Sequence, residues 1–237
     1  MTKIFEAVTS LREGNFVLIH DDDNREDEVD MVISSQHVAP RHIATMRKDA
    51  GGLICTAISK EISNKLGLPF IYDVLNIFGT ANKTISLINQ NSSPYGDKPS
   101  FSISLNHVDT YTGITDNDRA LTISSLANIC SELAKSIELN AQKAILEKFQ
   151  KSFRAPGHVP ILIASKELLN ERKGHTEMSI FLTKIANMTN VTTICEMLDP
   201  YNYKALSYKD AVEYAKENNL VILEAKELIT YAKSYGN

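Results

Sequence analysis

Acidic side chains dominate one short stretch of this 237-residue chain, residues 21–30, which read DDDNREDEVD. Seven of its ten residues are Asp or Glu, and the stretch directly follows an apolar run, residues 16–19, that is typical of a buried strand. Carboxylates this close together repel one another unless a cation relieves them, and a divalent metal or Arg25 can do so. Mg²⁺ binds through one or two carboxylates and keeps several waters, so the stretch predicts a magnesium site. A solvated acidic turn remains the alternative from these residues alone.

A second candidate site is the stretch RKGHTE, residues 172–177, which opens an expected helix. Free backbone N–H groups at a helix start, a preceding arginine and lysine, and the hydroxyl of Thr176 together make a phosphate-binding cradle. Gly174 allows close approach of the backbone, and His175 is a potential metal ligand. The alternative is an exposed connection between helices, capped by the threonine.

Three further positions carry groups suited to acid–base chemistry or substrate contact. His158 follows a Pro-Gly turn, Glu196 ends an expected β-branched strand, and Thr112 starts the polar stretch TGITDNDR, residues 112–119. Histidine titrates near neutral pH and a carboxylate can be tuned toward it, which suits general acid–base catalysis. Each position also has a structural alternative, namely a surface histidine, an exposed carboxylate and a capped turn.

Alternating helices and strands must position these groups. Apolar residues at helical spacing over residues 3–13 predict an amphipathic helix, and alternation over 101–106 predicts a strand with one polar face. Residues 70–100 accumulate Asn, Ser, Gly and Pro toward their end, which predicts a long loop. Pro160 predicts that the strand over 159–163 starts there or lies at a sheet edge. The other expected strands are 16–20, 31–36, 53–58, 191–196 and 220–222, and the other expected helices are 40–49, 59–67, 120–138, 141–151, 165–171, 176–188, 207–218 and 224 onward.

This alternation predicts a single α/β domain over residues 1–237, a three-layer α/β/α sandwich with a mixed, twisted sheet. A hydrophobic content of 43% is typical of a globular protein, and a net charge of −4 gives no electrostatic footprint for nucleic acid. No apolar run is long enough to span a membrane, and the N-terminus lacks a signal-peptide core. Cys55, Cys130 and Cys195 lack metal-type spacing, so we expect free thiols in a reducing cytoplasm.

Six motifs, taken together and in order, resemble the 3,4-dihydroxy-2-butanone 4-phosphate synthase family in its archaeal, monofunctional form. Their joint spacing covers nearly the whole chain, which makes the resemblance far more specific than any single motif. The motifs are NREDEVD at 24–30, MRKDAGGLIC at 46–55, TGITDNDRA at 112–120, RAPGHV at 154–159, GHTE at 174–177 and ICEM at 194–197.

The resemblance implies an Mg²⁺-dependent lyase, with Mn²⁺ as the other candidate metal. It implies that D-ribulose 5-phosphate is converted to L-3,4-dihydroxy-2-butanone 4-phosphate and formate in riboflavin biosynthesis. It also implies a homodimer with active sites near the subunit interface, and no nucleic-acid or membrane partner. The chemistry begins with enolisation next to a ketone, so it needs bases and a Lewis acid for the oxyanions that form.

The resemblance also assigns roles to individual residues. Metal ligands are expected at Glu26 and His175, and catalytic groups at His158 and Glu196. The expected substrate-binding residues are Arg25, Glu26, Asp30, Arg172, Lys173, Gly174, His175, Thr176 and Glu196. The second-tier candidates are Asp21, Glu28, Cys55 and Thr112.

Two positions depart from the family pattern. Val29 stands where glycine is common, and a β-branched residue disfavours a positive φ. Lys173 adds a charge beside the phosphate-binding stretch.

Two rival hypotheses remain: a lyase for a different phosphorylated keto-sugar, and a non-enzymatic module that binds a metal or a phosphorylated metabolite. A binding module has no need of His158 and Glu196.

Overall fold

Seven strands and ten α-helices make up the part of the chain that the computed structural model describes, residues 2–22, 25–91 and 93–235. The strands form one mixed sheet in the order β4-β5-β3-β6-β2-β1-β7. They are β1 (Val17–His20), β2 (Val29–Ser34), β3 (Cys55–Ile58), β4 (Phe101–His107), β5 (Phe153–Ile163), β6 (Val191–Glu196) and β7 (Val221–Glu224). The helices are α1 (Thr2–Arg12), α2 (Pro40–Thr45), α3 (Lys60–Leu66), α4 (Ile71–Gly79), α5 (Lys83–Asn89), α6 (Asp116–Lys135), α7 (Leu139–Ser152), α8 (His175–Ile185), α9 (Tyr208–Glu217) and α10 (Ala225–Tyr235).

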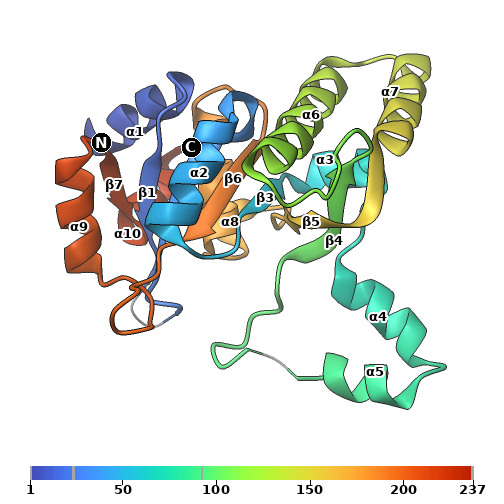
Figure 1. Ribbon diagram of the computed structural model, residues 1–237, viewed down its shortest axis with the longest axis horizontal. Helices are drawn as coiled ribbons and strands as arrows, with labels where there is room; N and C mark the ends of the chain where they lie inside the picture. Colours follow the sequence, from blue (N-terminus) through green and yellow to red (C-terminus); the bar gives the residue numbers. More distant parts are fainter. Residues whose placement is uncertain (1, 23–24, 92, 236–237) are drawn as a thin grey trace.

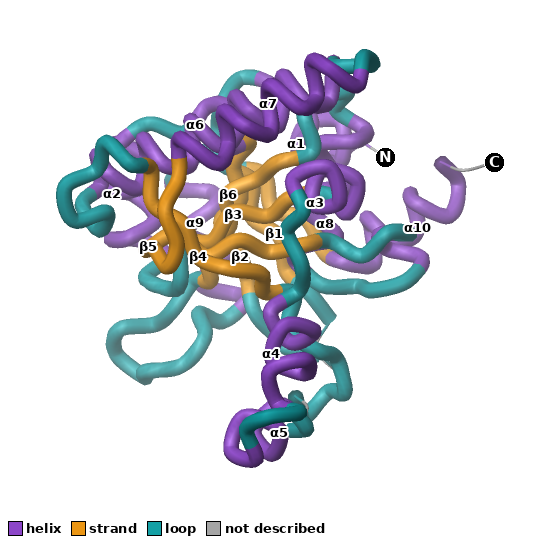
Figure 2. The backbone as a smooth tube through the Cα atoms, turned by 90° about the vertical axis from the view of Figure 1, so that its right-hand side faces the viewer, coloured by secondary structure: helices purple, strands orange, loops and turns teal. Residues whose placement is uncertain are grey.

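Hydrophobic cores fill both faces of the sheet, so the expected three-layer α/β/α sandwich with a mixed sheet is confirmed. Along β2, Met31 and Ile33 join one core, while Val32 points into the other. Helices α2, α6 and α7 cover one face and α1, α8 and α10 the other, with the sheet between them (Figure 2). Burial on both faces makes the central strands almost continuously apolar. Among the described residues, no helix is both long and apolar enough to cross a membrane.

Local signals predicted many of the element boundaries correctly. Ser59 caps α3 by accepting a hydrogen bond from the Ile62 backbone N–H, and Gly67 ends that helix at φ 69°. Ser207 caps α9 in the same way. These caps satisfy backbone groups that a helix end leaves unpaired.

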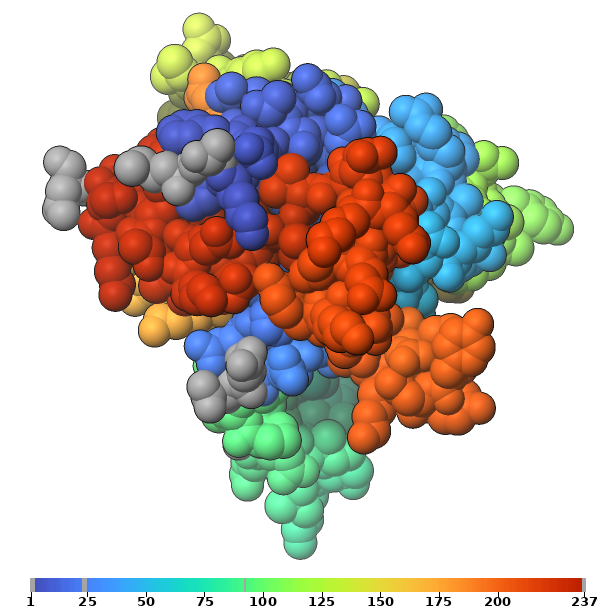
Figure 3. Space-filling model, turned by 90° about the vertical axis from the view of Figure 1, so that its left-hand side faces the viewer, coloured from blue at the N-terminus to red at the C-terminus, as the bar shows by residue number. Residues whose placement is uncertain are grey.

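The expectation of a long loop over residues 70–100 is wrong for its first part. Helices α4 and α5 occupy most of it, and Asn82 caps α5 with its side chain. Neither helix contains a buried residue, and Ile77 is 75% exposed. The pair projects from the body of the protein (Figures 1 and 3). The apolar residues of α4 recur at helical spacing, yet Val74 and Phe78 of this stripe are exposed and not packed into the main core.

Four other expectations also need correction. Strand β5 begins at Phe153, so residues 153–158 are strand and not loop, and Pro160 lies in an inner strand between β4 and β3. Pro160 is tolerated there because the β4–β5 ladder shifts register at Ser104, its partner. Within residues 165–171 only Leu168–Asn170 form a short 3₁₀ helix, and residues 46–50, expected as the end of an α-helix, form a π-helical turn.

Candidate active site

The acidic stretch is the loop of a β-hairpin, between β1 and β2. Asp21 organises it: its carboxylate accepts hydrogen bonds from the backbone N–H groups of Glu26 and Glu28, at 3.2 and 3.0 Å, and from Arg25 at 3.0 Å. Val29 opens β2 opposite His20 with a buried side chain, so the departure at this position is accommodated by the strand. Asp23 and Asn24 lie outside the described residues.

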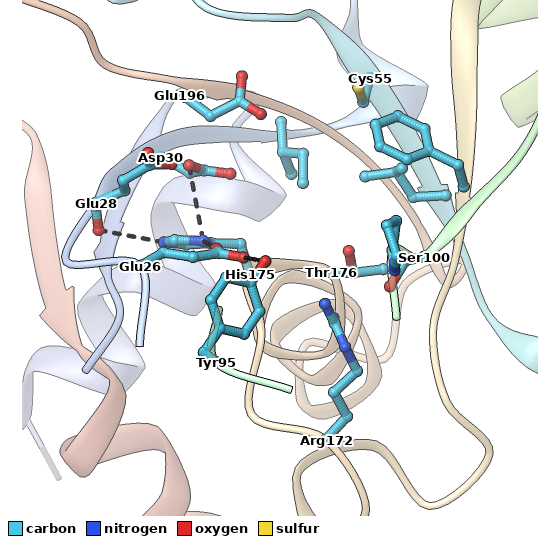
Figure 4. Close-up of a pocket in the computed structure, with 14 residues that line it drawn as sticks. Glu26, Glu28, Asp30, Cys55, Tyr95, Ser100, Arg172, His175, Thr176 and Glu196 are labelled. Carbon is cyan, nitrogen blue, oxygen red and sulfur yellow. Dashed lines mark hydrogen bonds and ion pairs between the residues drawn. The ribbon is translucent and has the colours of Figure 1, made fainter. Parts of the chain in front are cut away.

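Glu26 and His175 meet although 149 residues separate them in the chain. The Glu26 carboxylate accepts hydrogen bonds from the Nδ1 of His175 at 3.3 Å and from the hydroxyl of Tyr95 at 2.6 Å. The other ring nitrogen of His175 lies 3.3 Å from the backbone oxygen of Glu28. His175 begins α8, so the helix start predicted to carry a ligand delivers it to the acidic loop (Figure 4).

Charge coupling in this cluster changes the pKa values of its members. Burial alone would raise the pKa of Glu26, but hydrogen bonds from His175 and Tyr95 and the charge of Arg25 lower it to about 2. Burial alone would lower the pKa of His175, but the carboxylates of Asp30, Glu26 and Asp21 raise it to about 9. The protonated imidazole is thus favoured, because an acceptor lies at each ring nitrogen.

Asp30 and Glu196 lie directly opposite each other on the antiparallel strands β2 and β6. Burial, with Glu196 and the other nearby carboxylates, raises the pKa of Asp30 to about 7, although His175 opposes the shift. One oxygen of Asp30 is buried without a hydrogen-bond partner. Glu196 accepts a hydrogen bond from the Leu53 backbone N–H at 2.7 Å, and Gly52 leaves the room for this approach, because a Cβ there would collide with Glu196.

Two arginines, here called the arginine wall, lie across from these carboxylates: Arg172 lines the pocket, and Arg25 approaches it over Gly174. Arg172 donates to the fully buried Glu177 at 2.6 Å, and the second oxygen of Glu177 accepts from the Ser165 backbone at 2.9 Å. The guanidinium groups of Arg172 and Arg25 approach over Gly174, where any Cβ would run into both. Glu177 therefore fixes Arg172, a role that the sequence analysis missed.

The segment that precedes β4 supplies two more residues that the sequence analysis missed. Tyr95 reaches Glu26, and Asp97 lies between the two arginines, 3.1 Å from Arg25 and 3.5 Å from Arg172. Both partners lie about 70 residues away in the sequence, so no local pattern could have identified them.

The structure gathers most of the expected site residues around one pocket of about 200 Å³ (Figure 4). Burial raises the pKa of the Cys55 thiol and also that of Glu28, which neighbouring carboxylates raise further. Lys173 is exposed and not part of the lining. Expected site residues that line the pocket are Glu26, Glu28, Asp30, Cys55, Arg172, His175, Thr176 and Glu196.

His158 and Thr112 do not reach this pocket within the chain; they form a second cluster with Asn106. The amide oxygen of Asn106 accepts a hydrogen bond from the His158 backbone N–H at 2.8 Å. The amide nitrogen of Asn106 lies 3.1 Å from the Nδ1 of the His158 ring and donates to the Thr112 carbonyl at 3.4 Å. Phe101, on β4, lines the pocket, whereas Asn106 is five residues further along this strand. At about 3.3 Å per residue, the second cluster lies roughly 16 Å from the pocket along β4.

Four carboxylates line the pocket across from Arg172, and the buried His175 lies at the start of α8. The carboxylates are those of Glu26, Glu28, Asp30 and Glu196. Hard divalent cations prefer oxygen ligands, and guanidinium groups bind phosphate in a forked geometry. The fold and the site thus define a class: an α/β protein built to hold a divalent cation and a small phosphorylated anion together.

Comparisons with known proteins place the chain in one family. Residues 5–231 match the family described as 3,4-dihydroxy-2-butanone 4-phosphate synthase. The chain therefore belongs to the 3,4-dihydroxy-2-butanone 4-phosphate synthase family. It is 43% identical to the synthase of that name from Methanothermobacter thermautotrophicus over 95% of this chain and 94% of the relative, and 38% identical to that from Archaeoglobus fulgidus over 97% and 94%.

A solved structure agrees with this assignment. A crystal structure of 3,4-dihydroxy-2-butanone 4-phosphate synthase in complex with two magnesium ions superposes with a TM-score of 0.75 at 26% identity, covering 98% of this chain and 96% of that one. The resemblance to the family expected from the six motifs is confirmed.

Proposed function

We propose that the chain converts D-ribulose 5-phosphate into L-3,4-dihydroxy-2-butanone 4-phosphate and formate, in riboflavin biosynthesis. The observation that carries the proposal is the pocket itself, where the carboxylates of Glu26, Asp30 and Glu196 face Arg172. Membership of the synthase family supports it. The atoms balance without a co-reactant, because the five-carbon substrate divides into a four-carbon product and formate.

The arginine wall binds the phosphate group of the substrate in this proposal. Arg172 is held by Glu177 on one side, which leaves its Nε buried without a hydrogen-bond partner. Thr176 and the start of α8 lie beside it, with backbone N–H groups that no helical carbonyl accepts. Binding the phosphate there directs the sugar carbons toward the carboxylates across the pocket.

Glu196 and Asp30 carry the proton transfers in this proposal. The Leu53 N–H holds one oxygen of Glu196 and so fixes the orientation of the carboxylate at the pocket. Burial and the neighbouring carboxylates raise the pKa of Asp30, so this carboxyl holds a proton more readily than an ordinary aspartate does. Enolisation next to the ketone, loss of water and release of formate all need such transfers.

Glu26 and His175 would hold a divalent metal ion, Mg²⁺ or Mn²⁺. The donor set fits: one ligand atom each of Asp21, Glu26 and His175 lies within 4.8 Å of the other two, and a buried oxygen of Asp30 lies 3.8 Å from His175 without a hydrogen-bond partner. Glu26 and His175 line the pocket whereas Asp21 does not, which favours Glu26 and His175 as the ligands. When bound, the ion would act as a Lewis acid toward substrate oxygens.

A homodimer completes the site in this proposal. His158 is the expected acid–base residue, yet the Asn106 cluster that holds it lies away from the pocket of its own chain. A second copy that brings its Asn106 cluster against the pocket would add His158 and Thr112. We further propose that residues 1–237 act as one domain, in the cytoplasm where primary biosynthesis takes place.

Mixing two inactive variants tests the shared site. Refolding equal amounts of His158→Ala and Glu196→Gln together should restore about a quarter of wild-type activity, because half of the dimers are mixed and each mixed dimer has one intact site. No recovery, with mixed dimers verified by two affinity tags, would contradict a site shared between subunits.

The function itself is tested by formate release. Purified protein with ribulose 5-phosphate and Mg²⁺ should produce formate, measured by coupling to formate dehydrogenase, and a phosphorylated aldose should yield none. Folded, metal-loaded protein that binds ribulose 5-phosphate without releasing formate would instead indicate a binding module.

A further inference from the structure

A short segment of the chain, residues 93–98, lies against the mouth of the pocket and supplies an anion to it. The segment connects the projecting α4–α5 pair to β4. Its Asp97 carboxylate accepts hydrogen bonds from the Nη2 and Nε of Arg25, at 3.1 and 3.3 Å, and lies 3.5 Å from the Nε of Arg172. Its Tyr95 donates to Glu26, and the Arg25 guanidinium lies 4.9 Å from the centre of the Tyr95 ring. The segment is thus tied to both the arginine wall and the acidic loop.

The position of Asp97 is the position that an incoming phosphate needs. Two guanidinium groups that approach over Gly174 repel each other unless an anion lies between them. Glu177 neutralises Arg172 from behind, and Asp21 does the same for Arg25. On the pocket side Arg25 also pairs with Glu26, at 2.9 Å, but the anion that lies near both guanidinium groups is Asp97. Carboxylate and phosphate oxygens make the same forked contacts with guanidinium groups, so the two ligands are mutually exclusive there.

The contacts of Asp97 are weak enough to be displaced. Its side chain is 36% exposed, whereas the side chain of Glu177 is fully buried. Its hydrogen bonds to Arg25 are longer than the 2.6 Å contact between Arg172 and Glu177. A partly exposed ion pair contributes little, while a phosphate dianion carries more charge and more acceptor oxygens.

We propose that Asp97 is a built-in competitor for the phosphate position, which the substrate phosphate displaces as it binds, releasing residues 93–98 from the pocket mouth. This inference rests on the proposed function, because it takes Arg25 and Arg172 as the phosphate-binding pair. Asp97 then contributes to specificity: a ligand without a phosphate dianion cannot displace the carboxylate, so ribulose without its phosphate leaves the segment in place. The competing possibility is that Asp97 binds the substrate and closes over it.

The chain contains no tryptophan, which gives a clean reporter of the segment. Pro94 is exposed and next to Tyr95, so Pro94→Trp places a single fluorophore on residues 93–98. Titration of the metal-free full-length protein with inorganic phosphate should lower the tryptophan anisotropy as the segment is released. Adding Asp97→Asn should lower the starting anisotropy and tighten phosphate binding about three- to tenfold.

Asp109→Asn on the same reporter is the matched control. This substitution removes the same charge at a side chain that is 78% exposed, beyond the far end of β4. It should leave both the anisotropy and the phosphate affinity unchanged. Weaker or unchanged phosphate binding in Asp97→Asn would overturn the proposal, as would an anisotropy that does not fall or phosphate that does not bind.

Failure of the competitor and failure of the function are separable. If the wild type releases formate but Asp97→Asn does not bind phosphate more tightly, the proposed role of Asp97 alone is refuted. Tighter phosphate binding in Asp97→Asn without formate release from the wild type would refute the proposed reaction alone.

Discussion

Replacing Arg172 with alanine should damage binding and folding by two separate routes. On the pocket side the substitution removes a charge-assisted contact to the substrate phosphate, worth about 1.5–3 kcal/mol, which corresponds to a KM raised about 10- to 150-fold. The contact exists before and during the reaction, so kcat should change little. On the other side the substitution leaves the fully buried carboxylate of Glu177 without its ion-pair partner, with only the Ser165 backbone N–H still donating to it among the described residues.

The cost to folding follows from that stranded carboxylate. Leaving one partner of a buried ion pair alone costs about 3–5 kcal/mol. For a chain of this size, that lowers the melting temperature by roughly 6–20 °C. The double variant Arg172→Ala/Glu177→Gln removes the stranded charge, so it should recover most of the lost stability without recovering KM.

Steady-state kinetics and thermal melts of both variants separate the two effects. Arg12→Ala is the matched control, because Arg12 is an exposed arginine that donates to the Ala186 backbone, at 2.9 Å, away from the pocket lining. It should leave KM unchanged. An unaltered KM in Arg172→Ala, or a KM restored by the double variant, would refute the assignment of Arg172 to the phosphate.

Three further predictions concern other parts of the site. Glu196→Gln should abolish formate release while substrate binding, measured by calorimetry, stays within about tenfold of wild type; unfolding would instead assign Glu196 a structural role. Asn106→Ala should lower kcat more than it raises KM, because it frees the His158 ring, and an unchanged kcat would separate that cluster from the chemistry. Burial and the hydrogen bond to Asp49 raise the pKa of Tyr214 above its ordinary value of 10. The contribution of Tyr214 to the free energy of unfolding is therefore complete below pH 10 and is lost as the pH rises above that value. Tyr214→Phe should reduce this loss of stability at alkaline pH, measured by urea titration.

Elements with strong local signals could be predicted from the sequence. The caps of α3 and α9 and the apolar β1 and β6 follow from side chains close to them in the chain. Strand β5 was underestimated because Pro160 indicated an edge strand, and only the register shift of its partner strand permits it inside the sheet. Helix α4 does carry a helical pattern, because Ile71, Val74 and Phe78 recur at helical spacing. The segment was assigned as loop because Asn, Ser, Gly and Pro accumulate at its end, over residues 89–99.

Predicting the site was limited by contacts between distant parts of the chain. Motif resemblance identified Glu26 and His175, which the structure brings together across 149 positions. Tyr95 and Asp97 carried no motif, since their roles depend on the path of the segment before β4. Glu177 resembled an ordinary helix-start residue, and only its burial beside Arg172 reveals its role. Local chemistry was readable from the sequence, whereas the pairing of charges required the fold.

The carbon balance of the reaction tests the proposed function most directly. Uniformly ¹³C-labelled ribulose 5-phosphate, followed by NMR in the presence of the protein and Mg²⁺, should give labelled formate and a labelled four-carbon phosphate in equal amounts, and excess chelator should stop both. Consumption of the substrate to a five-carbon isomer, or no consumption by folded, metal-loaded protein, would contradict the assignment of this pocket to the synthase reaction.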